Sequence, residues 1–113
     1  MQFQFHAIAG PTPTLIVESA EGYTYRAQLF AQSGNCARAI EDATKAIQLE
    51  PQFLLAYQIR ANCQTQINQP DKAIEDATRV IELDPSNPQS YAGRGIFYGS
   101  VGQQEKAQAD YKK

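Results

Sequence analysis

Few side chains in this 113-residue chain are of the types that carry out chemistry, and their spacing matches no catalytic or metal motif. The single histidine, His6, has no cysteine, aspartate or glutamate at ligand spacing nearby, which favours a solvated or strand-face histidine. Cys36 and Cys63 form no C-x-x-C motif. The sequence also shows no phosphate-binding loop and no nucleophile elbow. We therefore predict that the protein is not an enzyme and needs no cofactor or metal.

Paired carboxylates and clustered glycines are the remaining candidates for chemistry. The acidic pair at 41–42 recurs at 75–76 together with its surroundings, so we interpret both pairs as solvated helix faces rather than as an acid–base site. Three glycines superficially suggest a dinucleotide-binding loop, but they lie in a helical pattern with no preceding strand. Close helix packing is the interpretation that we prefer for Gly93, Gly95 and Gly99.

A 34-residue repeat organises most of the chain. Twelve residues recur 34 positions later, namely Tyr23, Arg26, Ala27, Ala39, Ile40, Glu41, Asp42, Ala43, Thr44, Ile47, Leu49 and Pro51. A shorter third copy contains Tyr91, Arg94, Gly95, Ala107 and Asp110. A fixed period of this length indicates an array of one supersecondary unit. It therefore favours a recognition surface over a single active site.

Each copy of the repeat predicts two helices, because apolar residues recur at helical spacing between turn and breaker residues. Gly34, Asn68 and Gly102 occupy the predicted turns, where a left-handed residue is needed. Asn87 is the expected N-cap of the fifth helix. The predicted helices span residues 20–33, 37–49, 54–67, 71–83, 88–101 and 104–113.

Residues 1–19 lie outside the repeat. Polar and apolar residues alternate there around a Gly-Pro breaker at 10–13, which predicts a hairpin of roughly 2–9 and 14–18. The alternative is an unstructured leader. A folded hairpin would need a surface to pack on, and we expect it to cover the first helix pair.

The residue pattern of each copy resembles the tetratricopeptide repeat family. The first copy has Tyr23, Ala27, Gly34, Ala39, Ala43, Ala46 and Pro51 at the family positions. The second has Tyr57, Ala61, Asn68, Ala73, Ala77, Val80 and Pro85, and the third has Tyr91, Gly95, Gly102, Ala107 and Tyr111. The resemblance covers residues 20–113, with repeats at 20–53, 54–87 and an incomplete 88–113. It implies an all-α, right-handed superhelical solenoid of about three helix–turn–helix repeats.

Two kinds of contact should hold each helix pair together. Small residues let helices approach closely, so the predicted crossings are Ala27 with Ala39, Ala61 with Ala73, and Gly95 with Ala107. Arginine at 26, 60 and 94 and aspartate at 42, 76 and 110 share repeat positions. They would form an ion pair within each repeat, or else remain separately solvated charges of little energetic value.

The resemblance also implies a concave groove lined by the first helix of each repeat. Carried over by position, the peptide-binding residues are Thr24, Gln28, Gln32, Leu55, Gln58, Ile59, Asn62, Gln66, Gln89 and Ile96. One branch of the family binds acidic chaperone tails through lysine, arginine and asparagine. The corresponding residues here are Thr24, Gln28, Ile59, Gln89 and Gly93. None of them is a cation, so we predict no binding of that type.

These features predict a non-catalytic scaffold that binds a protein or peptide partner in the groove. The alternative is a structural or self-associating segment of a larger protein, because the third copy lacks the usual final solvating helix. A net charge of −2 and a pI of about 5.3 give no nucleic-acid or membrane footprint. The two cysteines are interpreted as reduced thiols, which favours the cytoplasm, although adjacent helices could bring them within reach of a disulfide.

Overall fold

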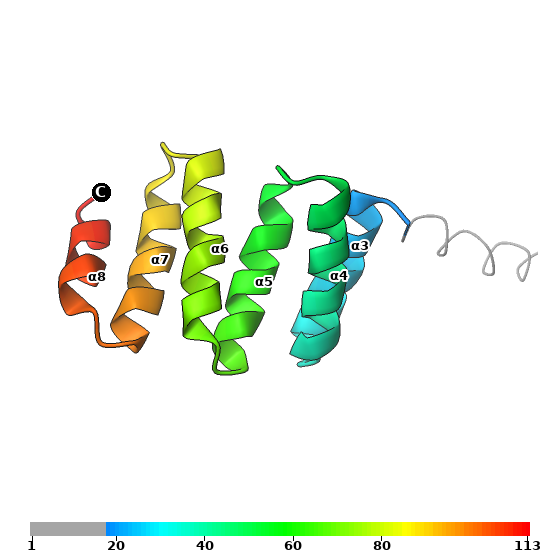
Figure 1. The fold of residues 1–113 in the computed structure, drawn as a ribbon, viewed down its shortest axis with the longest axis horizontal. Coiled ribbons are helices and arrows are strands. Elements are labelled where there is room, and N and C mark those ends of the chain that lie inside the picture. The colour runs from blue at the N-terminus through cyan, green and yellow to red at the C-terminus, as the bar shows by residue number, and fades with distance from the viewer. Residues whose placement is uncertain (1–17) are drawn as a thin grey trace, which may run out of the picture.

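The computed structural model describes residues 18–113, and these residues form an array of α-helices (Figure 1). The helices are α3 (Ala20–Gln32), α4 (Cys36–Leu49), α5 (Leu54–Gln66), α6 (Pro70–Leu83), α7 (Pro88–Ser100) and α8 (Gln104–Tyr111). The all-α repeat fold is confirmed, and the observed helix ends lie within one or two residues of the predicted ones. The predicted N-terminal hairpin and His6 lie outside the described residues.

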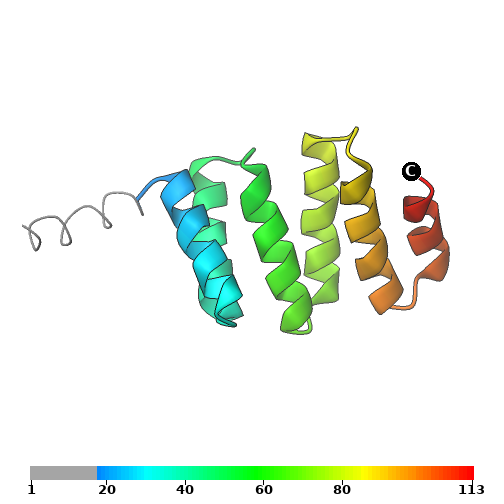
Figure 2. The ribbon, with the colours of Figure 1, turned by 180° about the vertical axis from the view of Figure 1, so that it is seen from behind.

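Consecutive helices pack as antiparallel neighbours along the array. Helix α4 lies in front of α3 in Figure 1 and behind it in Figure 2, so the two helices of a repeat belong to opposite faces of the solenoid. Each helix contacts the next one in the chain, and α3 also contacts α5, the first helix of the following repeat. None of the described helices is long and apolar enough to span a membrane.

The turn inside each repeat depends on a left-handed residue. Gly34 has a φ of +86°, Asn68 of +65° and Gly102 of +81°. Glycine and asparagine tolerate this backbone region better than other residues do. The next helix then begins within one or two residues, and α6 begins directly at Pro70, whose missing N–H would have had no helical partner there. The prediction for all three turns is confirmed.

Small residues bring the two helices of a repeat together. Ala27, Ala39 and Ala73 are fully buried, and Ala61 is nearly so. In the third repeat, the small residue on the first helix is a glycine. A Cβ atom added to Gly95 would lie 2.7 Å from the Tyr111 ring and 3.2 Å from the Ala107 carbonyl oxygen, so a larger residue would not fit there. The first two repeats have an alanine on each helix at these two positions.

An arginine–aspartate pair joins the two helices of every repeat, which confirms the predicted ion pairs. The Arg60 Nε atom lies 2.7 Å from Asp76 Oδ2, and its Nη2 atom lies 2.9 Å from Oδ1. The corresponding distances are 2.7 and 2.9 Å for Arg26–Asp42 and 2.9 Å for both contacts of Arg94–Asp110. The three aspartates are buried. Hydrogen bonding to Asp76 raises the pKa of Arg60 above its usual value.

The same arginines also connect one repeat to the next. Arg60 Nη1 donates to Thr44 Oγ1 at 3.1 Å, and Arg94 Nη1 donates to Thr78 Oγ1 at 3.2 Å. Each of these threonines belongs to the second helix of the preceding repeat. One guanidinium group therefore fixes both the helix pair and the stacking of consecutive pairs.

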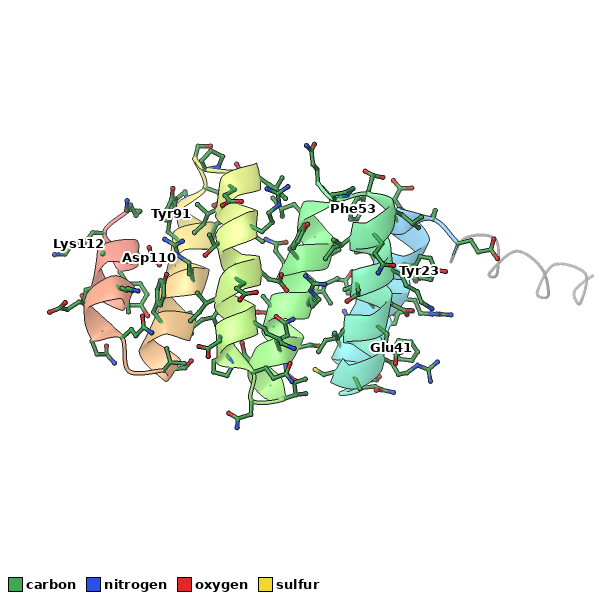
Figure 3. The ribbon with its side chains drawn as sticks, in the orientation of Figure 1. Tyr23, Glu41, Phe53, Tyr91, Asp110 and Lys112 are labelled. Atoms are coloured by element: carbon green, nitrogen blue, oxygen red, sulfur yellow. The ribbon has the colours of Figure 1, made fainter. Side chains whose placement is uncertain are left out.

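A tyrosine next to each ion pair carries a cation over its ring. Lys45 lies 5.5 Å from the Tyr23 ring centroid, and Lys113 lies at the same distance from Tyr91; both tyrosines are labelled in Figure 3. Arg79 lies 6.0 Å from the Tyr57 ring in the second repeat. Each repeat therefore places one further cation over the tyrosine ring beside its ion pair.

We predict that Arg60→Gln lowers the free energy of unfolding by about 3 kcal/mol, because the buried Asp76 carboxylate loses its partner. The matched control is Arg38→Gln, since Arg38 lies 3.9 Å from Glu41 and both side chains are more than half exposed. That change should cost less than about 1 kcal/mol. Urea denaturation measures both values, and equal losses would contradict the structural role of the Arg60 pair.

Candidate functional site

A groove of about 520 Å³ crosses the face of the solenoid formed by the first helices of the repeats. Helix α5 lies along its middle, with α3 and α7 on either side. Its floor is made by Ala77 and Val80 of α6, the second helix of the middle repeat. Three successive repeats are therefore needed to form the complete groove.

Eight of the ten predicted groove residues line this hollow, namely Gln28, Gln32, Leu55, Gln58, Ile59, Asn62, Gln66 and Gln89. Ile96 is 60% exposed on α7 but does not line it. Thr24 is only 2% exposed, and its hydroxyl donates to the Ala20 carbonyl oxygen at 2.7 Å. The Thr24 hydroxyl hydrogen is therefore used within α3 and is not available to a ligand.

Projection from the repeat pattern missed several residues of the groove. Phe97, Arg94 and Cys63 belong to first helices, while Ala77 and Val80 come from a second helix. The prediction considered only the exposed stripe of the first helices. Small residues at 77 and 80 of the second helix were the available signal, because they leave space between the neighbouring first helices.

Side-chain amides dominate the polar surface of the groove, and they carry no charge. Among the described residues that line it, Arg94 is the single charged one. Its guanidinium group already donates to Asp110 and Thr78, and the hydrogen bond to Asp110 raises its pKa. The groove therefore presents amide donors and acceptors together with apolar carbon, and no uncompensated charge.

Two thiols lie beside the groove wall. Cys36 and Cys63 are free and buried, and Cys36 Sγ donates to Gln66 Oε1 at 3.4 Å. Burial, followed by a hydrogen bond with Cys36, raises the pKa of Cys63 to about 12. A thiol with so high a pKa is a poor nucleophile at neutral pH. Cys36 therefore holds the Gln66 amide in place, and Cys63 is a poor nucleophile at neutral pH.

A second hollow, which we call the N-terminal hollow, adjoins the groove where α3 begins. Its lining residues are Ser19, Glu21, Gly22, Thr24, Tyr25, Gln28, Phe53 and Leu55. Gln28 and Leu55 line both hollows. The two hollows therefore adjoin each other at these two side chains.

Comparison with known proteins gives a consistent result. Two family models described as tetratricopeptide repeat match residues 54–87 and 77–109. No curated protein sequence matches this chain.

The similar solved structures include the crystal structure of MamA, with 25% sequence identity and a TM-score of 0.80 over 85% of this chain. The alignment covers 56% of the MamA chain, so this chain spans little more than half of that length. The second TPR of Spaghetti (RPAP3), bound to the HSP90 peptide SRMEEVD, is 27% identical, with a TM-score of 0.78 and coverage of 88% and 92% of the two chains. The Arabidopsis OM64 TPR domain is 23% identical, with a TM-score of 0.79 and coverage of 86% and 80%.

The raised pKa of Cys63 predicts a loss of stability in alkali. The unfolded thiol ionises near 9.0 and the folded thiol near 12, so this stabilisation is complete below pH 9.0 and is lost as the pH rises toward 12. Between pH 9.0 and about 12, the free energy of unfolding of the wild type should fall more steeply with pH than that of Cys63→Ala. We expect the two slopes to differ by up to about 1.4 kcal/mol per pH unit. Urea denaturation at about pH 8 and about pH 10.5 measures the difference. Identical pH slopes for the two proteins would refute it.

Proposed function

The chain belongs to the tetratricopeptide repeat family, and from this premise we propose that it is a non-catalytic scaffold that binds an extended peptide or partner helix in its concave groove. The observation that carries the proposal is the composition of the groove, in which amide side chains from the first helices of three successive repeats surround an apolar floor.

Amide side chains suit the backbone of an extended peptide. Each Gln or Asn offers two N–H donors and one carbonyl acceptor, so it can pair with peptide C=O and N–H groups alike. Gln58 and Asn62 lie one turn apart on α5, in the middle of the groove. They are therefore placed to contact neighbouring peptide groups of the same ligand.

Apolar residues in the groove favour a ligand with an apolar anchor. Leu55 is 42% exposed at one end, and Val80 and Phe97 line the deeper part. Burying apolar surface contributes about 25 cal/mol per Å², so one aliphatic ligand side chain contributes roughly 1.5–3 kcal/mol. Hydrogen bonds to the peptide backbone would then set the direction of the ligand, while the anchor would supply much of the affinity.

An acidic tail is a poor fit for this groove. Spaghetti was solved with the peptide SRMEEVD, which has two glutamates and a C-terminal aspartate. In this chain, the positions that correspond to the cationic clamp of that family branch hold Thr24, Gln28, Ile59, Gln89 and Gly93. Burying carboxylates without a cation is costly. We therefore propose an uncharged or weakly charged ligand.

Self-association through the C-terminal end has less support. Thr44 and Thr78 receive the arginine of the following repeat, and the equivalent residue of the third repeat is Lys112, labelled in Figure 3. One turn earlier, Ile40 packs against the core, whereas the equivalent Gln108 is exposed. The outer face of α8 therefore lacks the residues with which the earlier repeats hold their successors, and it would place a lysine against an incoming arginine.

Peptide-display selection against the purified protein tests the proposal, followed by calorimetry on the selected peptides. Gln58→Ala and Asn62→Ala should each weaken binding about fivefold, because each removes a ligand hydrogen bond worth about 1 kcal/mol. The matched control is Gln48→Ala, since Gln48 is exposed on α4 away from the groove. Equal effects of the Gln58 and Gln48 variants would place the ligand elsewhere.

A second experiment tests the prediction that the groove does not bind acidic peptide tails. Calorimetry with the peptide SRMEEVD should give no binding tighter than about 1 mM, because the groove offers no free cation to the carboxylates. Raising the salt concentration should not change the measured affinity, since there is no attraction between charges for the salt to screen. A micromolar, salt-sensitive dissociation constant would overturn the exclusion.

A further inference from the structure

Helix α3 lies at one end of the described array (Figure 2), and it carries the repeat positions that α5 uses to pack against the repeat before it. Tyr25 corresponds to Ile59, 34 residues later, and it is 63% exposed where Ile59 is 8% exposed. Leu29 corresponds to Cys63 in the same way, and it is 47% exposed where Cys63 is 0% exposed. Ile59 and Cys63 belong to the core cluster formed with the first repeat. The first repeat therefore leaves open a surface that the second repeat buries, and we call this surface, with Arg26, the α3 end face.

Arg26 differs from its counterparts in the same way. Arg60 and Arg94 each donate from Nε and Nη2 to the aspartate of their own repeat, and from Nη1 to a threonine of the preceding repeat. Arg26 makes only the first two bonds, to Asp42, at 2.7 and 2.9 Å. Among residues 18–113, no acceptor takes the bond from Arg26 Nη1, and this side chain is more exposed than those of Arg60 and Arg94. Because Asp42 fixes the guanidinium plane, the α3 end face presents an oriented donor beside its apolar side chains.

The two interfaces between consecutive repeats show which kind of helix covers such a face. Helix α4 receives α5, and α6 receives α7. Both receiving helices carry isoleucine, alanine, threonine and isoleucine at positions i, i+3, i+4 and i+7, namely Ile40, Ala43, Thr44 and Ile47 on α4 and Ile74, Ala77, Thr78 and Ile81 on α6. This spacing places the four side chains on one side of a helix. The threonine accepts the bond from the arginine, and the isoleucines pack beside it.

A second copy of this chain does not supply such a helix. Helices α4 and α6 are covered by the repeats that follow them, which leaves α8 as the available second helix. At the positions of the first isoleucine and of the threonine, α8 has Gln108 and Lys112. A lysine accepts no hydrogen bond, and its charge would repel that of Arg26.

We propose that the α3 end face docks a helix of a different protein, one that carries the pattern Ile-x-x-Ala-Thr-x-x-Ile of α4 and α6. In the complex, the threonine hydroxyl accepts the bond from Arg26 Nη1, and the isoleucines cover the exposed parts of Tyr25 and Leu29. None of these three residues lines the concave groove, so the docked helix leaves the groove open to its own ligand. This goes beyond the proposed function, because it assigns a second surface to a second partner.

A stapled helical peptide with the sequence of α6, residues 70–83, is the probe for this surface. The hydrocarbon staple joins positions 72 and 76, which lie on the side of the helix away from the pattern. The labelled peptide is titrated with the full-length protein, and fluorescence anisotropy reports binding. We expect saturation with a dissociation constant below about 1 mM, and weaker binding would overturn the proposal.

Variants of both partners test the register of the contact. The full-length variant Tyr25→Lys/Leu29→Lys should bind the peptide at least about tenfold more weakly, because it removes apolar surface from the contact. The matched control is Gln48→Lys/Gln52→Lys, which adds the same charge at two exposed positions and should bind as the wild type does. In the peptide, Thr78→Val should cost about fivefold, because Arg26 Nη1 loses its acceptor. Equal affinities of the two lysine variants, or of the two peptides, would overturn the proposal.

Photo-cross-linking identifies the occupant of the face directly. The full-length variant Tyr25→p-benzoylphenylalanine is irradiated with the peptide, and the products are mapped by mass spectrometry. A product with the peptide supports the proposal. Products with residues 1–17 of the same chain would assign the face to that segment, and products between two protein chains would assign it to a second copy; either result would overturn the proposal.

The groove variants separate this surface from the proposed peptide site. Gln58→Ala/Asn62→Ala should bind the stapled helix as tightly as the wild type does, since both residues line the groove and neither belongs to the α3 end face. If this variant loses the stapled helix while Tyr25→Lys/Leu29→Lys retains it, the helix lies in the groove. That result would overturn the docking face and support the proposed function.

Discussion

A buried arginine–aspartate pair is the interaction on which the rest of this structure depends. Each pair connects the first helix of a repeat to the second through two short hydrogen bonds, and the aspartate is almost fully removed from solvent. A buried carboxylate requires a hydrogen-bonded cation, so the arginine cannot leave without a large cost. Because Arg60 and Arg94 also donate to a threonine of the preceding repeat, the register within a repeat and the register between repeats are set by one group.

This arrangement explains why the groove contains amides and apolar side chains but no available charge. Three arginines and three aspartates are committed to the interface between the helices of each repeat, where Asp42, Asp76 and Asp110 are buried. Arg94 lines the groove and yet is saturated by Asp110 and Thr78. Most of the other polar side chains that the first helices contribute to the groove are Gln or Asn. Recognition by shape and by hydrogen bonds therefore follows from the way in which the repeats are stacked.

The repeat pattern predicted the helix pairs, the left-handed turns at Gly34 and Asn68, and the ion pairs, because those features depend on residues of one repeat and recur in the next. Eight of the ten predicted groove residues also line the groove. The pattern failed for Thr24, whose hydroxyl bonds to its own helix, and for Val80, which enters the groove floor from the second layer. Such features depend on the three-dimensional crossing of helices, which periodicity does not specify. The binding role of the groove residues and the structure of the first 17 residues stay predictions.

The contact between Gly95 and Tyr111 has a consequence for how such an array changes during evolution. In the first two repeats, alanines such as Ala61 and Ala77 share the space between the two helices. In the third repeat, the Tyr111 ring fills that space opposite Gly95. A genetic exchange that transfers a whole repeat keeps the two halves of this packing together. An exchange with its crossover inside a repeat would combine alanine with tyrosine and overfill the interface, or glycine with alanine and leave a void. The unit that can be duplicated or shuffled is therefore the intact helix pair, with its boundary between one second helix and the following first helix.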